Sequence, residues 1–591
     1  MIRRKPRYDY LLMLFVVAIS FFLIVVLNRR NYQDAWILDG IVVPTAIFIF
    51  SFLVAEVFIR DNKKVVILAA FLLAAMNLIP GLKYQSFSGV FDGPAHFRFT
   101  NEMVSRSYIP ENEFLSEMYG GNPAMHVFMA SFSIVSGIST NEVLSLIIPA
   151  LSGLIPFIIY FATKGILDDT IQRYVIIASS FPIVQRYIIY GTSLALLPYF
   201  LLIAIFVRNI FGKECKRRFG LIFIILGFNV IISHAITSFL VFFAFALVLL
   251  ILWLLEITRK KTLGRIRVST LVIPTVIYGI MFLAWWSVAS DFNLKRLASL
   301  MKALFVGEVR APVPTRFYDI PLLAQVQILA VFHLSDAIVV MLSLFGLSVF
   351  LWKLRRKVSS EAKTFYLYLI VLLTAFVSFL LFQFVSGFGS IEYERLMAYI
   401  MLLCIFLVGL TLWRLDEFLN RISVRPAAKN LVFASLLFIL VSSCLIQFHR
   451  CQPLVPGSNV LSSDLPEEEY LVQLGVVNTI YQIEMISFAE KYSYNSSVAS
   501  DVVTRFQIHG FSTPSFYLRH IRFNLLESNQ SLNWDLLLLH TFEGGQFEEP
   551  AEYRTKERIE NLRLEAGNLI YDNGASFIIS HSMYNPDATQ D

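Results

Sequence analysis

The chain has 591 residues, of which 57% are hydrophobic and only 16% are charged, and its formal net charge is +6. Soluble proteins carry about 25% charged and about 45–50% apolar residues, so this composition excludes a soluble globular enzyme and a disordered chain. The 4 Cys residues form no CxxC pair and no Cys/His cluster, which argues against a disulfide scaffold, a zinc site and an iron–sulfur site. The composition instead indicates an integral membrane protein.

The apolar residues are gathered into runs of about 16–23 residues, which as helices would cross the ~30 Å hydrocarbon core of a bilayer. The candidate spans are 9–27, 37–59, 65–81, 122–138, 143–163, 174–190, 194–208, 219–233, 236–256, 268–288, 334–352, 365–385, 396–413 and 430–447. We interpret the first as a retained helix, because it lacks a small-residue cleavage site.

Lys and Arg residues cluster between the runs and predict the topology. The clusters lie at 3–7, 60–64, 213–218, 259–267, 353–357 and 421–429. The positive-inside rule places them in the cytoplasm. Residues 1–451 then form a membrane domain with a cytoplasmic N-terminus, and residues 452–591 lie outside the cell membrane. This arrangement needs an odd number of crossings, and Pro182 marks 174–190 as a run that does not cross, so we expect about 13 transmembrane helices.

Residues 452–591 carry a net charge of −11, whereas the rest of the chain carries +17. Both Asn-X-Ser/Thr sequons, at Asn495 and Asn529, fall in this tail. Its pattern predicts an extracytoplasmic α/β domain, with helices over 467–492 and 549–567 and strands in SVASD, WDLLLLH, NLIYDNG and ASFIIS. The basic residues are dispersed over cytoplasmic loops, so we expect membrane lipid and not nucleic acid as their partner.

Residues 82–121 form the first long outer loop, which is too polar to span a bilayer and too aromatic for a plain linker. The proline in Asp-Gly-Pro-Ala-His suits the first turn of a helix. This helix would run over 94–106, with Asp92 at its N-terminus and His96 one turn further on the same face. The pattern predicts an amphipathic helix at the outer interface, with Glu102 on its wet face.

Three segments of this region carry a family resemblance. Asp92-Gly-Pro-Ala-His96, the later YIP, and Asn122-Pro-Ala-Met-His126 before an apolar helix and GIS resemble the GT-C class of membrane glycosyltransferases, in particular its archaeal and bacterial branch. The Trp-Trp-Asp-Tyr-Gly motif of oligosaccharyltransferases is missing. Trp285-Trp286 is followed by Ser-Val, and we interpret this pair as an interfacial anchor.

The resemblance implies a fold of many membrane helices followed by an outer domain of the α/β type. It also implies a sugar donor carried on polyprenyl phosphate, a glycan or protein acceptor, and transfer on the outer face. In this class an acidic residue near the start of the first outer loop lies at the active site. The matching residue in this chain is Asp92.

Transfer from a lipid-phosphate sugar needs a base that deprotonates the acceptor hydroxyl and cationic groups that hold the leaving phosphate. Asp92 suits the role of the base. It also suits a ligand of Mg²⁺ or Mn²⁺, because these ions take carboxylate oxygens. A third alternative is that Asp92 only caps the helix that follows it.

Six further residues are candidates for substrate binding, because they lie in outer loops or at outer ends of spans: His96, His126, His234, Arg310, Arg316 and Arg395. Arg310 and Arg316 belong to the Pro-rich outer loop 289–333, which resembles a lid over a cavity. Each candidate has an ordinary alternative. The histidines could face the interface or a turn, and the arginines could extend to lipid headgroups.

The sequence therefore predicts a membrane glycosyltransferase. The alternative is a polytopic transporter, or a flippase of lipid-linked sugars without transferase activity. Transporters tend to carry internal repeats and charges near the bilayer midplane. The pattern of 82–140 is not repeated later in the chain, and the polar residues gather at outer edges, which favours the transferase.

Overall fold

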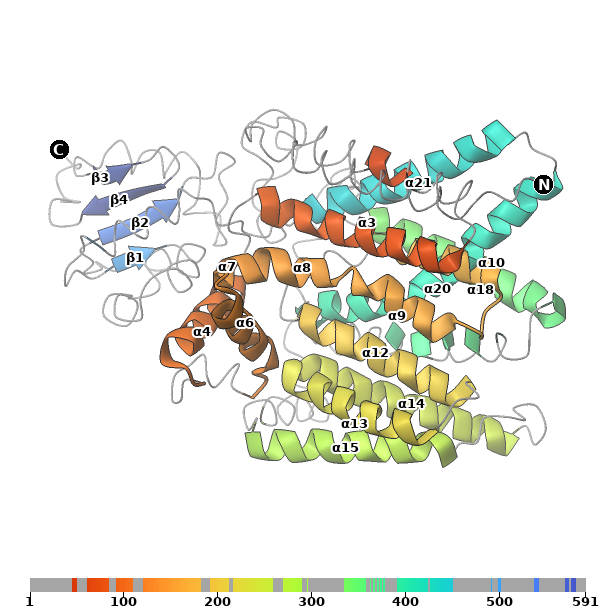
Figure 1. Ribbon diagram of the computed structural model, residues 1–591, viewed down its shortest axis with the longest axis horizontal. Coiled ribbons are helices and arrows are strands. Elements are labelled where there is room, and N and C mark those ends of the chain that lie inside the picture. Colours follow the sequence, from red (N-terminus) through yellow and green to blue (C-terminus); the bar gives the residue numbers. More distant parts are fainter. Residues whose placement is uncertain are drawn as a thin grey trace, which may run out of the picture.

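The protein is represented by a computed structural model in which most described residues are helical (Figure 1). The described residues are 45–49, 51, 61–83, 92–109, 121–181, 192–211, 216–258, 269–289, 295, 334–357, 362, 365–366, 369–370, 372–374, 376–377, 391–422, 426–449, 491, 498–500, 536–540, 569–572 and 576–580.

The helices follow the apolar runs of the sequence. In chain order they are α3 (Asn62–Lys83), α4 (Asp92–Arg106), α6 (Ala124–Ser136), α7 (Thr140–Glu142), the π-helix η2 (Val143–Ile147), α8 (Ile148–Leu151), α9 (Leu154–Thr163), α10 (Asp169–Ala178), α12 (Thr192–Phe211), α13 (Lys216–Ser233), α14 (Ala235–Thr258), α15 (Ser269–Ala289), α18 (Leu334–Lys357), α20 (Ile391–Arg421) and α21 (Pro426–His449). This confirms the helical reading of the runs that the structure describes. The run 9–27 and most of 37–59 and 365–385 lie outside the described residues.

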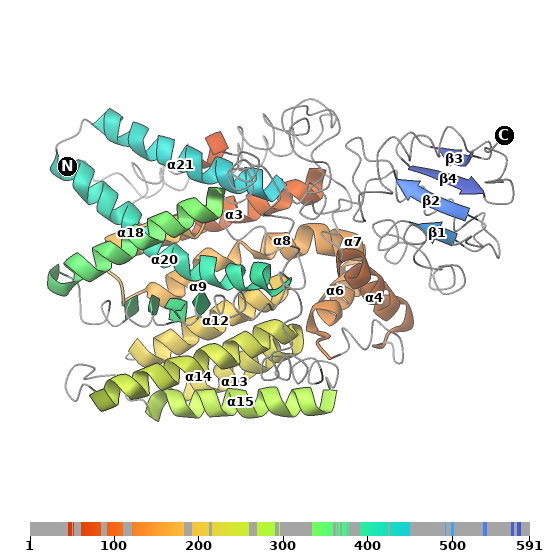
Figure 2. The same cartoon turned by 180° about the vertical axis from the view of Figure 1, so that it is seen from behind.

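The run 122–138 forms a shorter helix than the sequence predicts. α6 has 13 residues, about 20 Å at 1.5 Å per residue, whereas the hydrocarbon core is ~30 Å thick. The helix ends at Gly137, whose φ of 71° is left-handed and whose N–H donates to Ser133 O. A helix of this length is too short to cross the core unaided, and α6 runs across the end of the bundle rather than along its helices (Figures 1 and 2). We therefore treat α6 as lying outside the membrane-spanning segments, while the number of spans stays a prediction.

The run 143–163 forms one interrupted helix. Ser139 and Glu142 make reciprocal capping hydrogen bonds at its start, and the π-helix η2 follows directly. A second break lies at Ser152 and Gly153, between α8 and α9. A side chain at Gly153 would meet the carbonyl oxygen of Ala70 at 2.8 Å, so this break packs closely against α3. The described part of the run 174–190 is also short, because α10 ends at Ala178.

α20 is the central helix of the bundle, and its residues 399–412 are almost all fully buried. Glycines let two neighbours approach it at backbone distance. A Cβ atom at Gly409 would lie 2.6 Å from Cα of Val175 on α10, and one at Gly346 of α18 would clash with the carbonyl oxygen of Leu407. Small residues of this kind are typical where helices pack within a membrane.

The outer faces of α13, α15, α18 and α21 are apolar. The side chains of Leu221, Ile273, Ile280, Met341 and Leu431 are each more than half exposed. Contiguous exposed apolar surface is unfavourable in water and suits contact with lipid. Among the described residues, two helical segments are long and apolar enough to cross a membrane, Val272–Ala289 and Tyr399–Arg421, and seven shorter apolar helices accompany them.

The helix ends fall into two groups at opposite ends of the bundle. At one end, Asn62 at the start of α3 bonds Gln172 near the start of α10, and Lys429 at the start of α21 pairs with Asp416 near the end of α20. At the other end lie α4 and α6, which run side by side (Figures 1 and 2). The predicted basic clusters that the structure describes lie at the first end, on α3, α13, α18, α20 and α21.

The tail contains a four-stranded mixed sheet built from the four strands that the sequence predicts. β1 (Val498–Ser500) pairs in parallel with β2 (Leu536–His540), β2 pairs antiparallel with β4 (Ser576–Ser580), and β4 pairs antiparallel with β3 (Leu569–Asp572). The sheet lies beyond the α4 and α6 end of the bundle (Figure 1). The helices predicted over 467–492 and 549–567 lie outside the described residues, apart from Lys491.

Candidate functional site

The predicted helix after the acidic loop motif is present. α4 begins at Asp92, two residues before the predicted start, and ends at Arg106 as predicted. Asp92 therefore lies one helical turn before His96. Whether this helix lies along the outer membrane surface stays a prediction.

His96 and His126 meet between α4 and α6. The distance from Nδ1 of His96 to Nε2 of His126 is 2.8 Å, and both side chains are buried. Phe99 packs its ring edge-on against His126, with the ring centroids 4.8 Å apart. One ring must donate and the other accept, so the two imidazoles share one hydrogen at this contact. The pair is a local unit that joins two segments 30 residues apart.

Burial lowers the pKa of His126 well below its usual value, and the neighbouring His96 lowers it further. His126 is therefore neutral at physiological pH. A neutral His126 bonded to a second imidazole can accept or pass on one proton, which is the ordinary role of histidine in acid–base catalysis.

The buried face of α4 differs from the predicted one at Glu102. The sequence pattern places Glu102 on the wet face, but its side chain is only 5% exposed. The reason is that α4 packs against α6 and α7 rather than against lipid headgroups alone: Phe99 and Met103 cluster with Ala130, and Thr140 bonds Asn101. The sequence contains no signal for this second contact surface, because it comes from α6 and α7.

Two hydrogen bonds attach this region to the helix bundle. The Asn122 side chain, just before α6, donates to the carbonyl oxygen of Ile231 on α13 at 2.7 Å. The indole Nε1 of Trp285 on α15 donates to Gly121 O at 2.8 Å. The interpretation of the two tryptophans as interfacial anchors is wrong for Trp286, whose side chain is buried against Phe282. The histidine pair thus lies near the ends of α13 and α15.

His234 lies in the turn between α13 and α14, as predicted, and is half-buried. Its Nδ1 lies 2.8 Å from Oγ1 of Thr237 and accepts a 3.2 Å hydrogen bond from the Thr237 backbone N–H. Oγ1 of Thr237 bonds in turn with the hydroxyl of Tyr399 on α20. The sequence analysis missed Thr237 and Tyr399, although Tyr399 follows the candidate Arg395 by one helical turn.

Arg395 lies in the first turns of α20, as the sequence predicts for the start of that helix. It lies one helical turn before Tyr399, whose hydroxyl takes part in the hydrogen bonds that lead to His234. Arg310 and Arg316 lie outside the described residues, and so does the loop 289–333 apart from Lys295. Their part in a lid stays a prediction.

The expectation that Asp92 binds Mg²⁺ or Mn²⁺ stays a prediction. Both ions prefer oxygen ligands, whereas the imidazoles of His96 and His126 bond each other. No group of three or more His, Cys, Asp or Glu side chains converges within the described parts of the chain. The reaction proposed below uses Asp92 as a base and routes no step through a metal.

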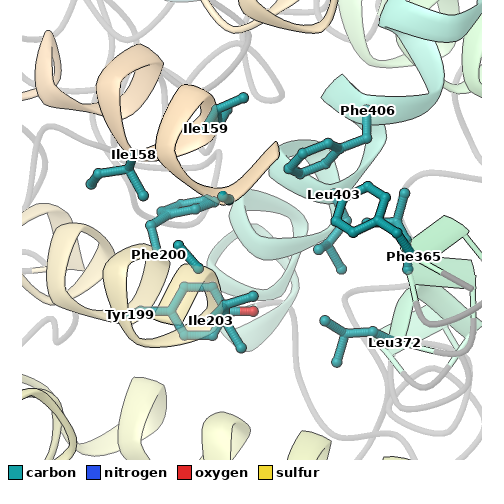
Figure 3. Close-up of a pocket in the computed structure, with 12 residues that line it drawn as sticks. Ile158, Ile159, Tyr199, Phe200, Ile203, Phe365, Leu372, Leu403 and Phe406 are labelled. Atoms are coloured by element: carbon teal, nitrogen blue, oxygen red, sulfur yellow. The ribbon is translucent and has the colours of Figure 1, made fainter. Parts of the chain in front are cut away.

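A small apolar cavity of about 30 Å³ lies deeper in the bundle (Figure 3). Its lining comes from α9, α12, α20 and described residues between 362 and 377, and includes Tyr199, Phe200, Leu403 and Phe406. The Tyr199 ring packs edge-on against Tyr399, with the centroids 4.9 Å apart. The lining residues are apolar apart from the hydroxyl of Tyr199, so we do not assign the reaction to this cavity.

Comparison with known proteins adds little to this description. No family model matches the chain, and no curated protein matches it. Among solved structures, it is similar to an oligosaccharyltransferase from Archaeoglobus fulgidus crystallised with zinc and sulfate, at 11% identity and a TM-score of 0.46. The match covers 80% of this chain and 68% of that one. We draw no conclusion from a similarity of this degree and infer the function from the residues of this chain.

Proposed function

We propose that this protein is a multi-pass membrane glycosyltransferase, which moves a sugar from a polyprenyl-phosphate donor to a glycan or protein acceptor on the extracytoplasmic face. The observation that carries the proposal is that the candidate segments converge. The hydrogen bond from Asn122 to Ile231 links the histidine pair to α13, and Thr237 links the turn of His234 to Tyr399 on α20. The segments that carry Asp92, the three histidines and Arg395 thus meet at one end of the bundle, which supports the proposal that they act together.

The distribution of charge supports an extracytoplasmic location for this end. Basic clusters occupy the opposite ends of α3, α13, α18, α20 and α21, and such clusters stay in the cytoplasm during membrane insertion. The acidic tail would then lie on the same side as the candidate site. The transferred sugar and its acceptor would meet between the bundle and this tail.

The proposed reaction assigns one role to each group. Asp92 accepts the proton of the acceptor hydroxyl, and the hydroxyl oxygen forms a bond to the anomeric carbon of the sugar. The bond between that carbon and the phosphate oxygen breaks, and polyprenyl phosphate leaves with the electron pair. Arg395 and His234 hold the phosphate oxygens, since charge-assisted hydrogen bonds are stronger than neutral ones. The hydrogen-bonded pair of His96 and His126 supports the helical turn that begins at Asp92.

One observation favours the alternative of a transporter or flippase. Interrupted helices are typical of transporters, and η2, α8 and α9 form such a helix. The side chain of Asn77 on α3 bonds Ser152 at the second break, which leaves polar groups inside the bundle. A transporter would need no acid–base group at its outer end, so the two functions make different demands on Asp92.

The test is a transfer assay with purified protein in liposomes. We expect labelled sugar to move from a polyprenyl-phosphate donor to an acceptor, and not from a soluble nucleotide sugar. Arg395→Ala should raise the KM for the donor with a smaller effect on kcat. Arg421→Ala, at the opposite end of α20, is the matched control. Movement of the intact donor across the bilayer without any sugar transfer would refute the transferase and support the flippase.

A further inference from the structure

The hydrogen bonds that connect His234, Thr237 and Tyr399 determine which imidazole nitrogen of His234 carries the hydrogen. A backbone N–H can only donate, and that of Thr237 points at Nδ1 of His234 at 3.2 Å. Nδ1 therefore carries no hydrogen and acts as the acceptor, which leaves the hydrogen of the neutral ring on Nε2. In a doubly protonated ring, the Nδ1–H would face the N–H of Thr237, and two donors cannot form a hydrogen bond with each other. The local geometry thus favours one neutral tautomer.

The accepting Nδ1 of His234 also sets the direction of the other hydrogen bonds in this series. Oγ1 of Thr237 lies 2.8 Å from the accepting Nδ1, so its hydroxyl donates to His234. Its oxygen is then free to accept the hydrogen of the Tyr399 hydroxyl. Hydrogen bonds aligned in this way polarise each other and strengthen the chain. The chain runs from Tyr399 through Thr237 to His234 and ends at the Nε2–H of the imidazole.

The inner part of this chain is rigid. Thr237 and Tyr399 are fully buried, and the Tyr399 ring is held edge-on by Tyr199 and in a stacked arrangement by Phe376. His234, by contrast, is only half-buried in the turn before α14. A buried, packed support below a partly accessible ring is the arrangement that fixes the orientation of a functional side chain.

We propose that Thr237 and Tyr399 are positioning residues that hold His234 as a neutral Nε2–H donor to a phosphate oxygen of the glycosyl donor. This inference rests on the proposed function for the identity of the ligand, but not for the tautomer. Because Arg395 lies one turn before Tyr399, the same helix would set both the cation and the neutral donor at one phosphate. Neither positioning residue touches substrate in this account.

The first test reads the tautomer without any activity assay. Protein labelled with [¹⁵N]histidine is reconstituted in bilayers for solid-state NMR, and the signals of His234 are assigned by their loss in His234→Gln. We expect an unprotonated Nδ1 and a protonated Nε2 in the wild type. Thr237→Val keeps the backbone N–H that donates to Nδ1 but removes the hydroxyl, so we expect the same tautomer with a shifted Nδ1 signal that reports the lost hydrogen bond. Ser238→Ala is the control, because that hydroxyl bonds only Ala235 O nearby. A protonated Nδ1 in the wild type would overturn the proposal, whatever the protein catalyses.

The second test compares two amides at position 234. The side-chain NH₂ of glutamine can take the place of Nε2–H, whereas that of asparagine lies nearer the place of Nδ1. His234→Gln should therefore keep more transfer activity than His234→Asn, by about tenfold or more if one donor to the phosphate is retained. Equal loss in both variants, with the expected tautomer in the NMR spectra, would overturn the role of His234 toward phosphate. Absence of transfer in the wild type itself would instead refute the proposed function.

Discussion

The side-chain amide of Asn122 donates a 2.7 Å hydrogen bond to the carbonyl oxygen of Ile231, three residues before His234. This bond joins the start of α6 to the end of α13, which are 109 residues apart in the chain. It therefore fixes the histidine pair relative to the turn that carries His234. Both residues are buried, so water does not compete for this hydrogen bond.

Asn122→Ala should loosen this junction. The change leaves the buried Ile231 carbonyl without its donor, which costs about 1–3 kcal/mol. We expect a lower melting temperature in detergent and reduced transfer activity. Asn229→Ala removes an exposed amide from the same helix end. Its oxygen accepts a 3.3 Å hydrogen bond from the Ser233 hydroxyl, which also donates to the Asn229 carbonyl oxygen at 2.6 Å, so this change should affect neither property. An unchanged melting temperature in Asn122→Ala would show that the junction is held by other contacts.

The stability of the folded protein should depend on pH through His126. Its pKa is lowered in the folded protein, so below about pH 6.5 the unfolded state binds a proton that the folded state does not. Stability should therefore fall as the pH falls below that value, by up to about 1.4 kcal/mol per pH unit for one group. The difference in melting temperature between pH 7.5 and pH 5.5 should be larger in the wild type than in His126→Gln. Equal differences would mean that His126 is protonated in the fold.

At Gly409, α20 and α10 pack too closely to accommodate a larger side chain. A methyl group there would lie 2.6 Å from Cα of Val175, and overpacking of this kind costs about 1–3 kcal/mol. Gly409→Ala should lower the melting temperature and the yield of folded protein. Gly220→Ala is the control, because nothing lies within 4 Å of a Cβ atom at that position of α13. Equal stability of both variants would contradict the close packing of α10 on α20.

The topology makes a prediction about the tail. The positive-inside rule and the acidic charge of 452–591 both indicate that the chain ends outside the cytoplasm. A periplasmic-type reporter that is active only outside the cytoplasm should be active when fused after Asp591. A reporter fused within 259–267 should be active only if it is of the cytoplasmic type. Activity of the cytoplasmic reporter after Asp591 would reverse the assignment.

Periodicity and composition predict the helices well because each apolar run must hydrogen-bond its own backbone in lipid, and a helix does this locally. The helix after Asp92 and the strands of the tail also follow from local patterns, as the pairing of Leu569–Asp572 with Ser576–Ser580 illustrates. The helix at 122–138 is two residues shorter at each end than the apolar run, because Pro123 precedes its start and Gly137 ends it, and apolar content alone does not report helix length.

The candidate site is less predictable, because its contacts join distant segments. The sequence identifies His96 and His126 singly, but nothing in it indicates that they bond each other across 30 residues. Tyr399 and Thr237 were missed for the same reason, since 162 residues separate them. Glu102 was assigned to a wet face because the helix pattern alone does not include the packing of α6 against it.

Asp92 carries the central claim. Asn is nearly isosteric with Asp, and loss of one negative charge in the first turn of a helix costs only about 0.3–1 kcal/mol, so Asp92→Asn should keep the fold and lower the melting temperature only slightly. An amide cannot take the proton of the acceptor, and loss of a general base costs about 10²–10⁴-fold in rate. Asp168→Asn, at the start of α10 and without a capping hydrogen bond, is the matched control.

The most direct measurement is the rate of labelled sugar transfer from a polyprenyl-phosphate donor in liposomes, at matched amounts of wild type, Asp92→Asn and Asp168→Asn. We predict that transfer falls by at least about 10²-fold in Asp92→Asn and is unchanged in Asp168→Asn. Transfer at the wild-type rate in Asp92→Asn would reduce Asp92 to a helix cap and would contradict the proposed glycosyltransferase site.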